Sequence, residues 1–219
     1  MKETLKGKET KQKILDCALE LFVARGYAGT SMNDIIQQLG ISKGSVYWHF
    51  KSKEDIFMQV ITESYDQWLS LVDEELAGIT DPIEKLRRYS QLFIKTVDIP
   101  VWRISPETYW NEFDNRNSII LDTLFAQDDI VLLKIFQEGI SKDLFIFSDP
   151  ADAEKLTWIY INCLEGMFEK IILSYKNVDP LTAPARDDSP VAAKYAAELE
   201  KHMEYALFAI DLFLKGITK

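Results

Sequence analysis

Apolar residues recur at intervals of three and four along nearly the whole chain, which is the spacing of one face of an α-helix. Ile14, Leu15, Ala18, Leu19 and Phe22 form the first such stripe, ahead of a glycine. Four later segments begin with a capping residue followed by proline, as helix starts often do: Asp81-Pro82, Ser105-Pro106, Asp149-Pro150 and Ser189-Pro190. No sustained alternation with hairpin turns indicates a sheet. The sequence therefore predicts an all-α fold of about nine helices.

Two short helices are predicted after the first, in the segment SMNDIIQQLGISKGSVYWHF. Ser31 with Asp34 matches a capping box, and Gly40 suits a helix C-terminus. Ser42 can cap the helix that follows. Two short helices joined by a glycine-containing turn form a helix-turn-helix, whose second helix enters the DNA major groove.

The charge distribution agrees with a DNA-binding N-terminal region. The chain carries a net charge of −10, but residues 1–53 hold nine Lys and Arg against five Asp and Glu. This region therefore carries +4 and the remainder −14. Such asymmetry is expected when only one end of a protein meets a polyanion. Without the motif, a solvated charged helix face would explain the same run.

The side chains expected to contact DNA lie in and around the second short helix. Small residues at its start allow close approach to base edges, whereas the hydroxyl, imidazole and ammonium groups can reach phosphate oxygens. Val46 and Phe50 are expected to face the core, and Trp48 either contacts the DNA backbone and thymine methyls or covers the small core. The predicted DNA contacts are Thr30, Ser42, Lys43, Gly44, Ser45, Tyr47, Trp48, His49, Lys51 and Lys53.

The segment ALELFVARGYAGTSMNDIIQQLGISKGSVYWHFKSKEDIF, residues 18–57, closely resembles the DNA-binding domain of the TetR family of bacterial transcriptional regulators. Ile36 and Leu39 depart from the pattern, because the family usually has small alanines there. The resemblance implies an all-α homodimer that binds an operator through its N-terminal domain. It also implies a divergent C-terminal ligand domain and a dimer interface formed by the last two helices. The matching residues are Gly26, Tyr27, Thr30, Ile35, Gly40, Ser42, Gly44, Tyr47, His49, Phe50 and Lys53.

Two domains are expected on this basis. Residues 1–52 form the helix-turn-helix DNA-binding domain, and residues 53–219 form a helical ligand-binding and dimerisation domain. The expected function is that of a ligand-responsive transcriptional repressor, which binds a pseudo-palindromic operator as a homodimer and is released by a small molecule. The alternative is a constitutive DNA-binding regulator or activator without an effector. A helix from residue 53 to about 77 is expected to connect the two functions.

The last two predicted helices are candidates for the dimer interface. Residues 151–175 are apolar around most of the helix circumference, and residues 190–215 carry a continuous apolar stripe. Both helices can therefore pack on one protomer and still offer an apolar face to a second copy. The alternative is that they only complete the core of a single chain.

Aromatic residues of the middle helices predict a pocket for an apolar or aromatic effector, since such pockets commonly lie between the helices of a bundle. Glu107, Glu112, Glu165 and Glu169 are candidate anchors, which favours a cationic aromatic compound. An acyl or other neutral lipid-like effector is the alternative, and core packing alone would also explain most of the aromatics. The predicted ligand contacts are Tyr65, Trp68, Trp102, Tyr109, Trp110, Phe113, Glu165 and Phe168.

Catalysis has little basis in this sequence. The two histidines, His49 and His202, are far apart, and there is no HExxH motif, Gly-rich phosphate loop or Cys/His cluster. We therefore expect no enzyme activity, no metal and no cofactor. The longest run without a charged residue, 156–164, is far shorter than the roughly 20 residues of a membrane span. Cys17 and Cys163 lie in apolar helical patterns, which predicts buried thiols and a cytoplasmic location.

Overall fold

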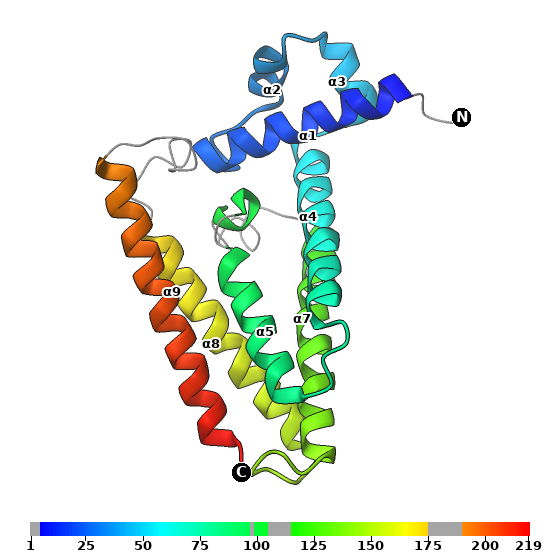
Figure 1. Cartoon of the computed structure of the whole chain (residues 1–219). Helices are drawn as coiled ribbons and strands as arrows, with labels where there is room; N and C mark the ends of the chain where they lie inside the picture. The colour runs from blue at the N-terminus through cyan, green and yellow to red at the C-terminus, as the bar shows by residue number, and fades with distance from the viewer. Residues whose placement is uncertain (1–4, 97–98, 105–114, 175–189) are drawn as a thin grey trace. The chain divides into compact units, whose positions relative to one another are not determined.

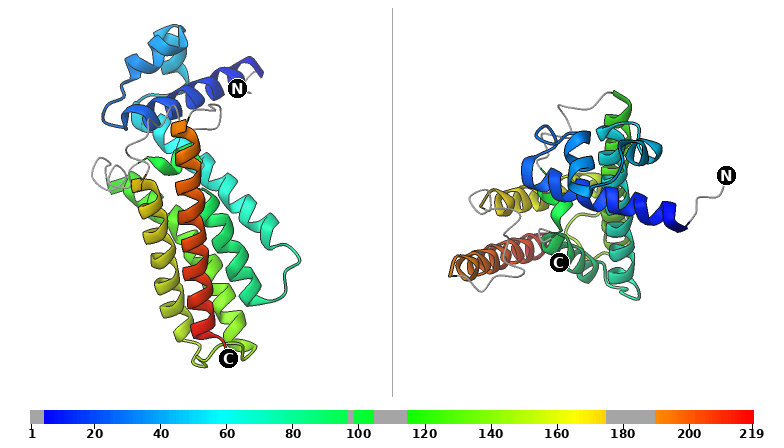
Figure 2. Two further views of the ribbon diagram at one scale, coloured as in Figure 1. Left: turned by 60° about the vertical axis from the view of Figure 1, so that its left-hand side comes forward. Right: turned by 90° about the horizontal axis from the view of Figure 1, so that it is seen from above.

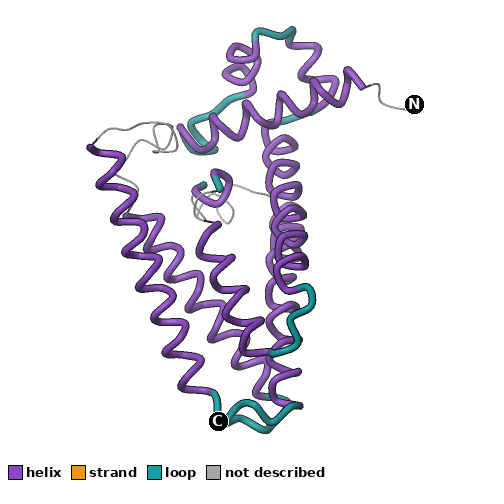
Figure 3. The backbone as a smooth tube through the Cα atoms, viewed as in Figure 1, coloured by secondary structure: helices purple, strands orange, loops and turns teal. Residues whose placement is uncertain are grey.

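The computed structural model describes residues 5–96, 99–104, 115–174 and 190–219, and their regular structure is helical (Figures 1 and 3). An isolated antiparallel bridge joins Phe145 to Thr218, and no strand is present among the described residues. The all-α prediction is confirmed. In chain order the elements are α1 (Leu5–Arg25), α2 (Met32–Leu39), α3 (Lys43–His49), α4 (Lys53–Leu76), α5 (Pro82–Lys95), the 3-10 turn η2 (Pro100–Arg103), α7 (Asn115–Ser141), α8 (Asp152–Ser174) and α9 (Pro190–Ile217).

Two compact units share the chain, and α4 and α7 each contribute to both. The N-terminal unit comprises Met1–Gln67 and Ile99–Leu121, and the C-terminal unit comprises Trp68–Asp98 and Asp122–Lys219. The predicted domain boundary after residue 52 falls at the start of α4, whereas the compact units divide inside this helix. The division by function therefore stays a prediction.

A small apolar core holds the first helices of the N-terminal unit together. The predicted stripe on α1 is buried, and Phe22 meets the rings of Tyr27 and Phe57 at centroid distances of 5.6 and 5.3 Å. Ile35 of α2 and Val46 of α3 are fully buried in the same unit. Because α2 and α3 are short, this core fixes them through few side chains and leaves most of their surface available.

Local capping interactions define the ends of the short helices. The Ser31 side chain accepts from the backbone N–H of Asp34, and the Asp34 carboxylate accepts from the backbone N–H of Ser31. Hydrogen bonds donated to the Asp34 carboxylate, first by the Ser31 hydroxyl and then by the Ser31 backbone N–H, hold the pKa of Asp34 below its usual value. Gly40 ends α2 with φ of 63°, in the left-handed region that favours glycine. Ser42 caps α3 through a hydrogen bond from the backbone N–H of Ser45. The predicted capping box and both helix ends are confirmed.

The C-terminal unit is a helical bundle in which α9 packs on α5 and α8, and these helices run side by side (Figures 1 and 2). Tyr160 of α8 lies in its interior. The Tyr160 hydroxyl donates to the carbonyl of Leu86 at 3.2 Å and lies 2.5 Å from Ser90 Oγ. Burial raises the pKa of Tyr160, so this hydroxyl keeps its proton and ties α8 to α5.

The predicted helix starts of this unit are partly confirmed. Asp81 caps α5 and Pro82 is its first residue, as expected. Asp149 caps a turn through the backbone N–H of Ala151 at 2.9 Å, so α8 begins at Asp152 rather than at Pro150. Two other predicted helix starts have capping residues, Ser105 and Ser189, that lie outside the described residues. Helix α9 begins at Pro190, directly after the second of them.

Two further predictions concern the membrane and the thiols. Among the described residues, none of the helices has the length and apolar character needed to cross a membrane. Cys17 is buried as expected, and burial raises the pKa of its thiol. Cys163 is exposed, which corrects the prediction, because it lies on the outward face of α8.

Candidate functional site

Helix α3 is held in the N-terminal unit from one side. Val46 and the C-cap residue Phe50 are buried, as predicted, whereas Lys43 and Gly44 are exposed. Tyr47 is 40% exposed, so its ring is not part of the buried core. The buried pair therefore anchors α3, and the remaining residues face outward.

The start of α3 offers small polar groups on an open surface. The Ser42 hydroxyl accepts a hydrogen bond from the backbone N–H of Ser45 at 3.1 Å, and its own proton can still be donated to a phosphate. A methyl group at Gly44 would meet no atom within 4 Å, so glycine is not required there by packing within the chain. Ser45 is half-buried beside it. Another molecule can therefore approach this end of the helix closely.

Aromatic and cationic side chains cover the outward face of α3. Trp48 is 63% exposed, which excludes its alternative role as a lid on the core. The Trp48 ring meets the His49 ring edge-on with centroids 4.5 Å apart, and His49 is half-buried. Lys43 Nζ lies 5.5 Å from the centre of the Tyr47 ring. These contacts order the outward side chains before any partner binds.

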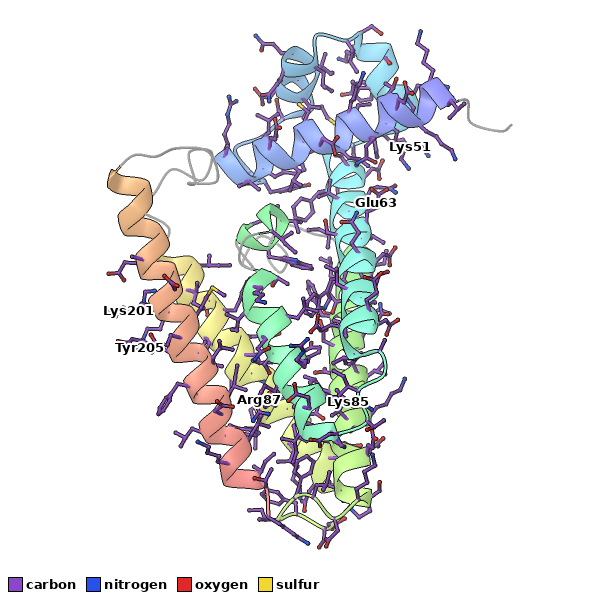
Figure 4. All side chains as sticks on the ribbon, in the orientation of Figure 1. Lys51, Glu63, Lys85, Arg87, Lys201 and Tyr205 are labelled. Carbon is purple, nitrogen blue, oxygen red and sulfur yellow. The ribbon has the colours of Figure 1, made fainter. Side chains whose placement is uncertain are left out.

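The predicted DNA contacts that flank α3 differ in how exposed they are. Lys51 is exposed, and Figure 4 shows its position just after α3. Lys53 donates to the carbonyl of Tyr27 at 2.6 Å and lies 3.9 Å from the centre of that ring, so a phosphate contact from Lys53 stays a prediction. Thr30 is buried, and its hydroxyl donates to the carbonyls of Gly26 and Leu21. The Thr30 side chain therefore has a structural role, and this placement does not support a DNA contact through it.

Trp68, Tyr89 and Asp128 form a buried hydrogen-bonded cluster in the C-terminal unit. Asp128 Oδ1 accepts from Trp68 Nε1 at 2.9 Å and from Tyr89 Oη at 2.6 Å. The Trp68 ring lies edge-on to Tyr89 at 5.8 Å and to Phe93 at 5.9 Å. A carboxylate surrounded by aromatic rings can attract an organic cation.

Phe168 and Glu165 extend this cluster onto α8. The half-buried Phe168 ring lies edge-on to Phe93 at 5.5 Å. Glu165 is exposed in the single chain, yet the protein around its carboxyl desolvates it enough to raise its pKa, and the charges of Asp129 and Asp128 raise it further. The pKa of Asp129 is raised in the same way, first by desolvation and then by Asp128. Asp128, Asp129 and Glu165 are therefore close enough for their charges to interact.

Two of the remaining predicted ligand contacts pair with each other. Tyr65 and Trp102 belong to the N-terminal unit, where their rings meet edge-on at 5.8 Å. Trp102 Nε1 is buried and has no hydrogen-bond partner among the described residues. Of the predicted set, the structure therefore brings together Trp68, Glu165 and Phe168. The predicted contacts Tyr109, Trp110 and Phe113, and the candidate anchors Glu107 and Glu112, lie outside the described residues.

Asp128 is the member of the cluster that sequence reasoning missed. It lies on α7 in register with Leu121, Leu124, Leu132 and Ile135, all of which are buried. The spacing of three and four residues places an acid on the buried stripe of a helix, where charged residues are rare unless paired. That break in the apolar stripe was the available signal.

Large apolar side chains are exposed along α8 and α9. Trp158 is 68% and Phe208 69% exposed in the single chain, and Ile159, Tyr205 and Leu212 are exposed as well. Figure 4 shows Tyr205 pointing outward from α9. Monomeric proteins rarely expose several large apolar residues on adjoining elements, and such a surface typically contacts another protein. We call these five residues the α8–α9 face.

Residues 14–60 match the TetR_N family, described as bacterial regulatory proteins of the tetR family. The chain is 44% identical over 54 residues to the HTH-type transcriptional regulator AcrR of Shigella flexneri, which covers 25% of each chain. It is 30% identical over 109 residues to the HTH-type transcriptional regulator QacR of Staphylococcus aureus, covering 50% of this chain and 58% of QacR. The matched segments thus span from a quarter to somewhat over half of these relatives.

Solved structures share the fold over almost the whole chain. One is described as a transcriptional regulator from Saccharomonospora viridis in complex with choline. It has a TM-score of 0.74 and 19% identity, and the match covers 97% of this chain and 99% of the other. At this identity the similarity establishes the fold alone. Any ligand of the present chain has to be inferred from its own side chains.

Proposed function

We propose that this chain, which belongs to the TetR family of bacterial regulatory proteins, is a transcriptional repressor released from DNA by a small organic cation. It binds a pseudo-palindromic operator as a homodimer. The outward face of α3 carries the proposal: Tyr47 and Trp48 are exposed on a helix anchored only by Val46 and Phe50. Exposed aromatic groups on a short helix gain little from water, and together with the cationic groups beside them they match the edges and backbone of a DNA groove.

In the proposed complex, α3 lies in the major groove with its first turn toward the bases. Lys43, Gly44 and Ser45 are close enough to the open helix start to meet base edges, and Tyr47 and Lys51 reach phosphates. Contacts of the first kind determine sequence preference, and contacts of the second kind determine position and salt dependence. A two-fold dimer would place its two α3 helices about 34–36 Å apart, one turn of DNA.

The proposed dimer forms through the α8–α9 face. Gly166 supports this assignment, because it lies on the outward side of α8 and a methyl group there would meet no atom within 4 Å in the described chain. A glycine inside a helix costs about 1 kcal/mol relative to alanine. Nothing among the described residues explains that cost, whereas the close approach of a second helix does.

The proposed effector site is the cluster around Asp128. Aromatic rings attract organic cations through their faces, and the carboxyl groups of Asp128, Asp129 and Glu165 supply negative charge. A quaternary ammonium has no N–H groups that require acceptors. Ring faces and negative charge are therefore sufficient to hold it. That a protein of the same fold is described in complex with choline makes a small quaternary ammonium the first probe to try.

Release would act through α4, which is continuous from Lys53 to Leu76. Trp68, in the second half of this helix, donates to Asp128. A cation that draws on the same carboxylate changes the contact that holds Trp68, and a helix transmits the displacement to its N-terminal end. To reverse a 99:1 occupancy the effector must favour the released state by roughly 5.5 kcal/mol, which two sites of about 100-fold preference supply.

The experiment begins with selection of a duplex from a random-sequence library by the purified full chain. Fluorescence anisotropy of that duplex is then titrated with choline, with benzyltrimethylammonium, and with 3,3-dimethyl-1-butanol as the neutral isostere of choline. We expect a two-fold symmetric selected sequence that is released by the cations and retained with the alcohol. Failure to select any sequence contradicts the DNA-binding proposal. Selection without release by any cation favours the constitutive regulator instead.

A further inference from the structure

The first turns of α1 extend beyond the core of the N-terminal unit. Residues 5–13 are helical, none of them is buried, and the buried stripe begins only at Ile14. At 1.5 Å per residue, these nine residues add roughly 13 Å of helix outside the core. They also precede the family match, which starts at residue 14. Figures 1 and 2 show this end of α1 running past α3.

This extension is an unfavourable place for the charges that it carries. The first turn among the described residues of α1 contains no acid, and Lys6 and Lys8 lie toward this end of the helix, where the dipole disfavours cations. It buries no apolar side chain that would offset the cost, and Leu5 is 83% exposed. An anion bound nearby would offset this unfavourable position.

The lysines of the extension lie on two faces of different character. Lys8 and Lys11 continue the spacing of the buried residues Leu15, Ala18 and Phe22. Lys11 is half-buried, and Lys8 is exposed at the edge of that stripe. The other pair, Lys6 and Lys13, lies on the opposite side. That side also carries Glu9, Asp16 and Glu20, which bring it close to neutral, so the basic charge is concentrated on the Lys8–Lys11 face.

The Lys8–Lys11 face lies at the C-terminal end of α3. Lys11 Nζ is 5.8 Å from the centre of the Phe50 ring, and Phe50 is the C-cap of α3. The next residue is the exposed Lys51. Because phosphates border the major groove, a basic surface beside the end of a groove-bound helix meets the DNA backbone rather than the bases.

We propose that Lys8, Lys11 and Lys51 form a second DNA-binding surface that holds the phosphate backbone flanking each half-site. This inference rests on the proposed operator binding, and it adds Lys8 and Lys11 of α1, outside the helix-turn-helix, to the phosphate contact already proposed for Lys51. The surface carries no sequence preference of its own. It adds affinity and salt dependence only on a duplex long enough to reach it.

A matched pair of variants tests the proposal, since K8Q/K11Q and K6Q/K13Q remove equal charge from opposite faces of the same turns. Each is titrated with the selected duplex in two forms, one ending at the half-sites and one extended by about 10 base pairs on each side, the length of one DNA turn. On the long duplex, K8Q/K11Q should lower the salt slope by about 0.9 for each phosphate that the variant no longer neutralises, whereas K6Q/K13Q should match the parent. On the short duplex all three proteins should bind alike.

Two results would overturn this surface. Equal losses of affinity for both pairs would mean general attraction by the N-terminal charge, and a parent-like K8Q/K11Q on the long duplex would mean that the extension touches no DNA. K8R/K11R keeps the charge and should bind as the parent does, which separates charge from helix disruption. If the parent selects no duplex, the proposed function fails first, so the two failures are distinguishable.

Discussion

Substitution of Asp128 by asparagine isolates the charge of the proposed effector site. Asp128 Oδ1 accepts from both Trp68 Nε1 and Tyr89 Oη, at 2.9 and 2.6 Å. An asparagine carbonyl can occupy the same position and accept the same two hydrogen bonds. The substitution therefore removes the negative charge while it keeps the two donors satisfied.

The expected loss of affinity follows from the charge alone. A cation roughly 5 Å from the carboxylate, at an effective dielectric constant of about 20, gains about 3 kcal/mol. The Asp128→Asn variant should therefore bind choline about 100-fold more weakly. Its affinity for 3,3-dimethyl-1-butanol should stay within about twofold of the parent value, because the neutral isostere gains nothing from the charge.

The stability of the variant should change much less than that of a leucine substitution. Hydrogen bonds to a charged acceptor are stronger than those to a neutral one, so Asp128→Asn should cost about 1–2 kcal/mol. Asp128→Leu leaves two buried donors, Trp68 Nε1 and Tyr89 Oη, without this acceptor, at about 1–3 kcal/mol each. For a chain of this size, that corresponds to a Tm lower by roughly 5–15 °C.

Isothermal titration with both probes, and thermal unfolding followed by circular dichroism, measure these quantities. The reasoning predicts a selective loss of cation binding in a folded protein. Equal losses for choline and its neutral isostere would show that Asp128 shapes the site without supplying charge. A parent-like affinity for choline in Asp128→Asn would place the cation elsewhere.

Three further predictions concern the other proposed contacts. Tyr47→Phe removes a hydroxyl from the outward face of α3, and should weaken binding to selected and unrelated duplexes alike while leaving the salt slope nearly unchanged, because the hydroxyl is neutral. Phe208→Glu places a charge on the α8–α9 face and should yield a folded monomer in light scattering. Lys134→Glu, at an exposed position on α7 outside this face, should not. Desolvation and neighbouring carboxylates raise the pKa values of Glu165 and Asp129, and a cation favours the ionised forms. Choline affinity should therefore rise from about pH 5 to about pH 7.5 with release of protons, seen by calorimetry in buffers of different ionisation enthalpy.

Elements fixed by local chemistry were the predictable ones. Ser31 with Asp34 forms a reciprocal pair three residues apart, which appears in the structure as predicted, and Ser52 with Asp55 forms a second pair of the same kind. Such pairs need no distant partner. The extension of α1 before Ile14 was not predicted, because it carries no apolar period from which a helix could be recognised.

Side chains whose role depends on distant partners were less predictable. Lys53 was expected to face DNA, but the carbonyl to which it donates belongs to Tyr27, 26 residues earlier. Asp128 lies 60 residues from Trp68 and 39 from Tyr89, so its role depends on how α4, α5 and α7 pack. Sequence periodicity assigns a residue to a face of a helix, and only the packed structure shows which groups meet there.

Both halves of α4 are held by polar contacts, and this gives the proposed release a measurable consequence. Lys53 donates to Tyr27, and Trp68, roughly 22 Å further along the helix, donates to Asp128. Release requires somewhat under 3 kcal/mol from each of two sites, and the charge interaction expected at Asp128 is about 3 kcal/mol. This energy drives release only if the cation contacts the carboxylate in the released state and not in the DNA-bound state. By linkage, saturating selected duplex must then weaken choline binding by the same total free energy, about 5.5 kcal/mol per dimer. Calorimetry of choline with and without the duplex measures this directly, and an unchanged affinity would separate cation binding from DNA release altogether.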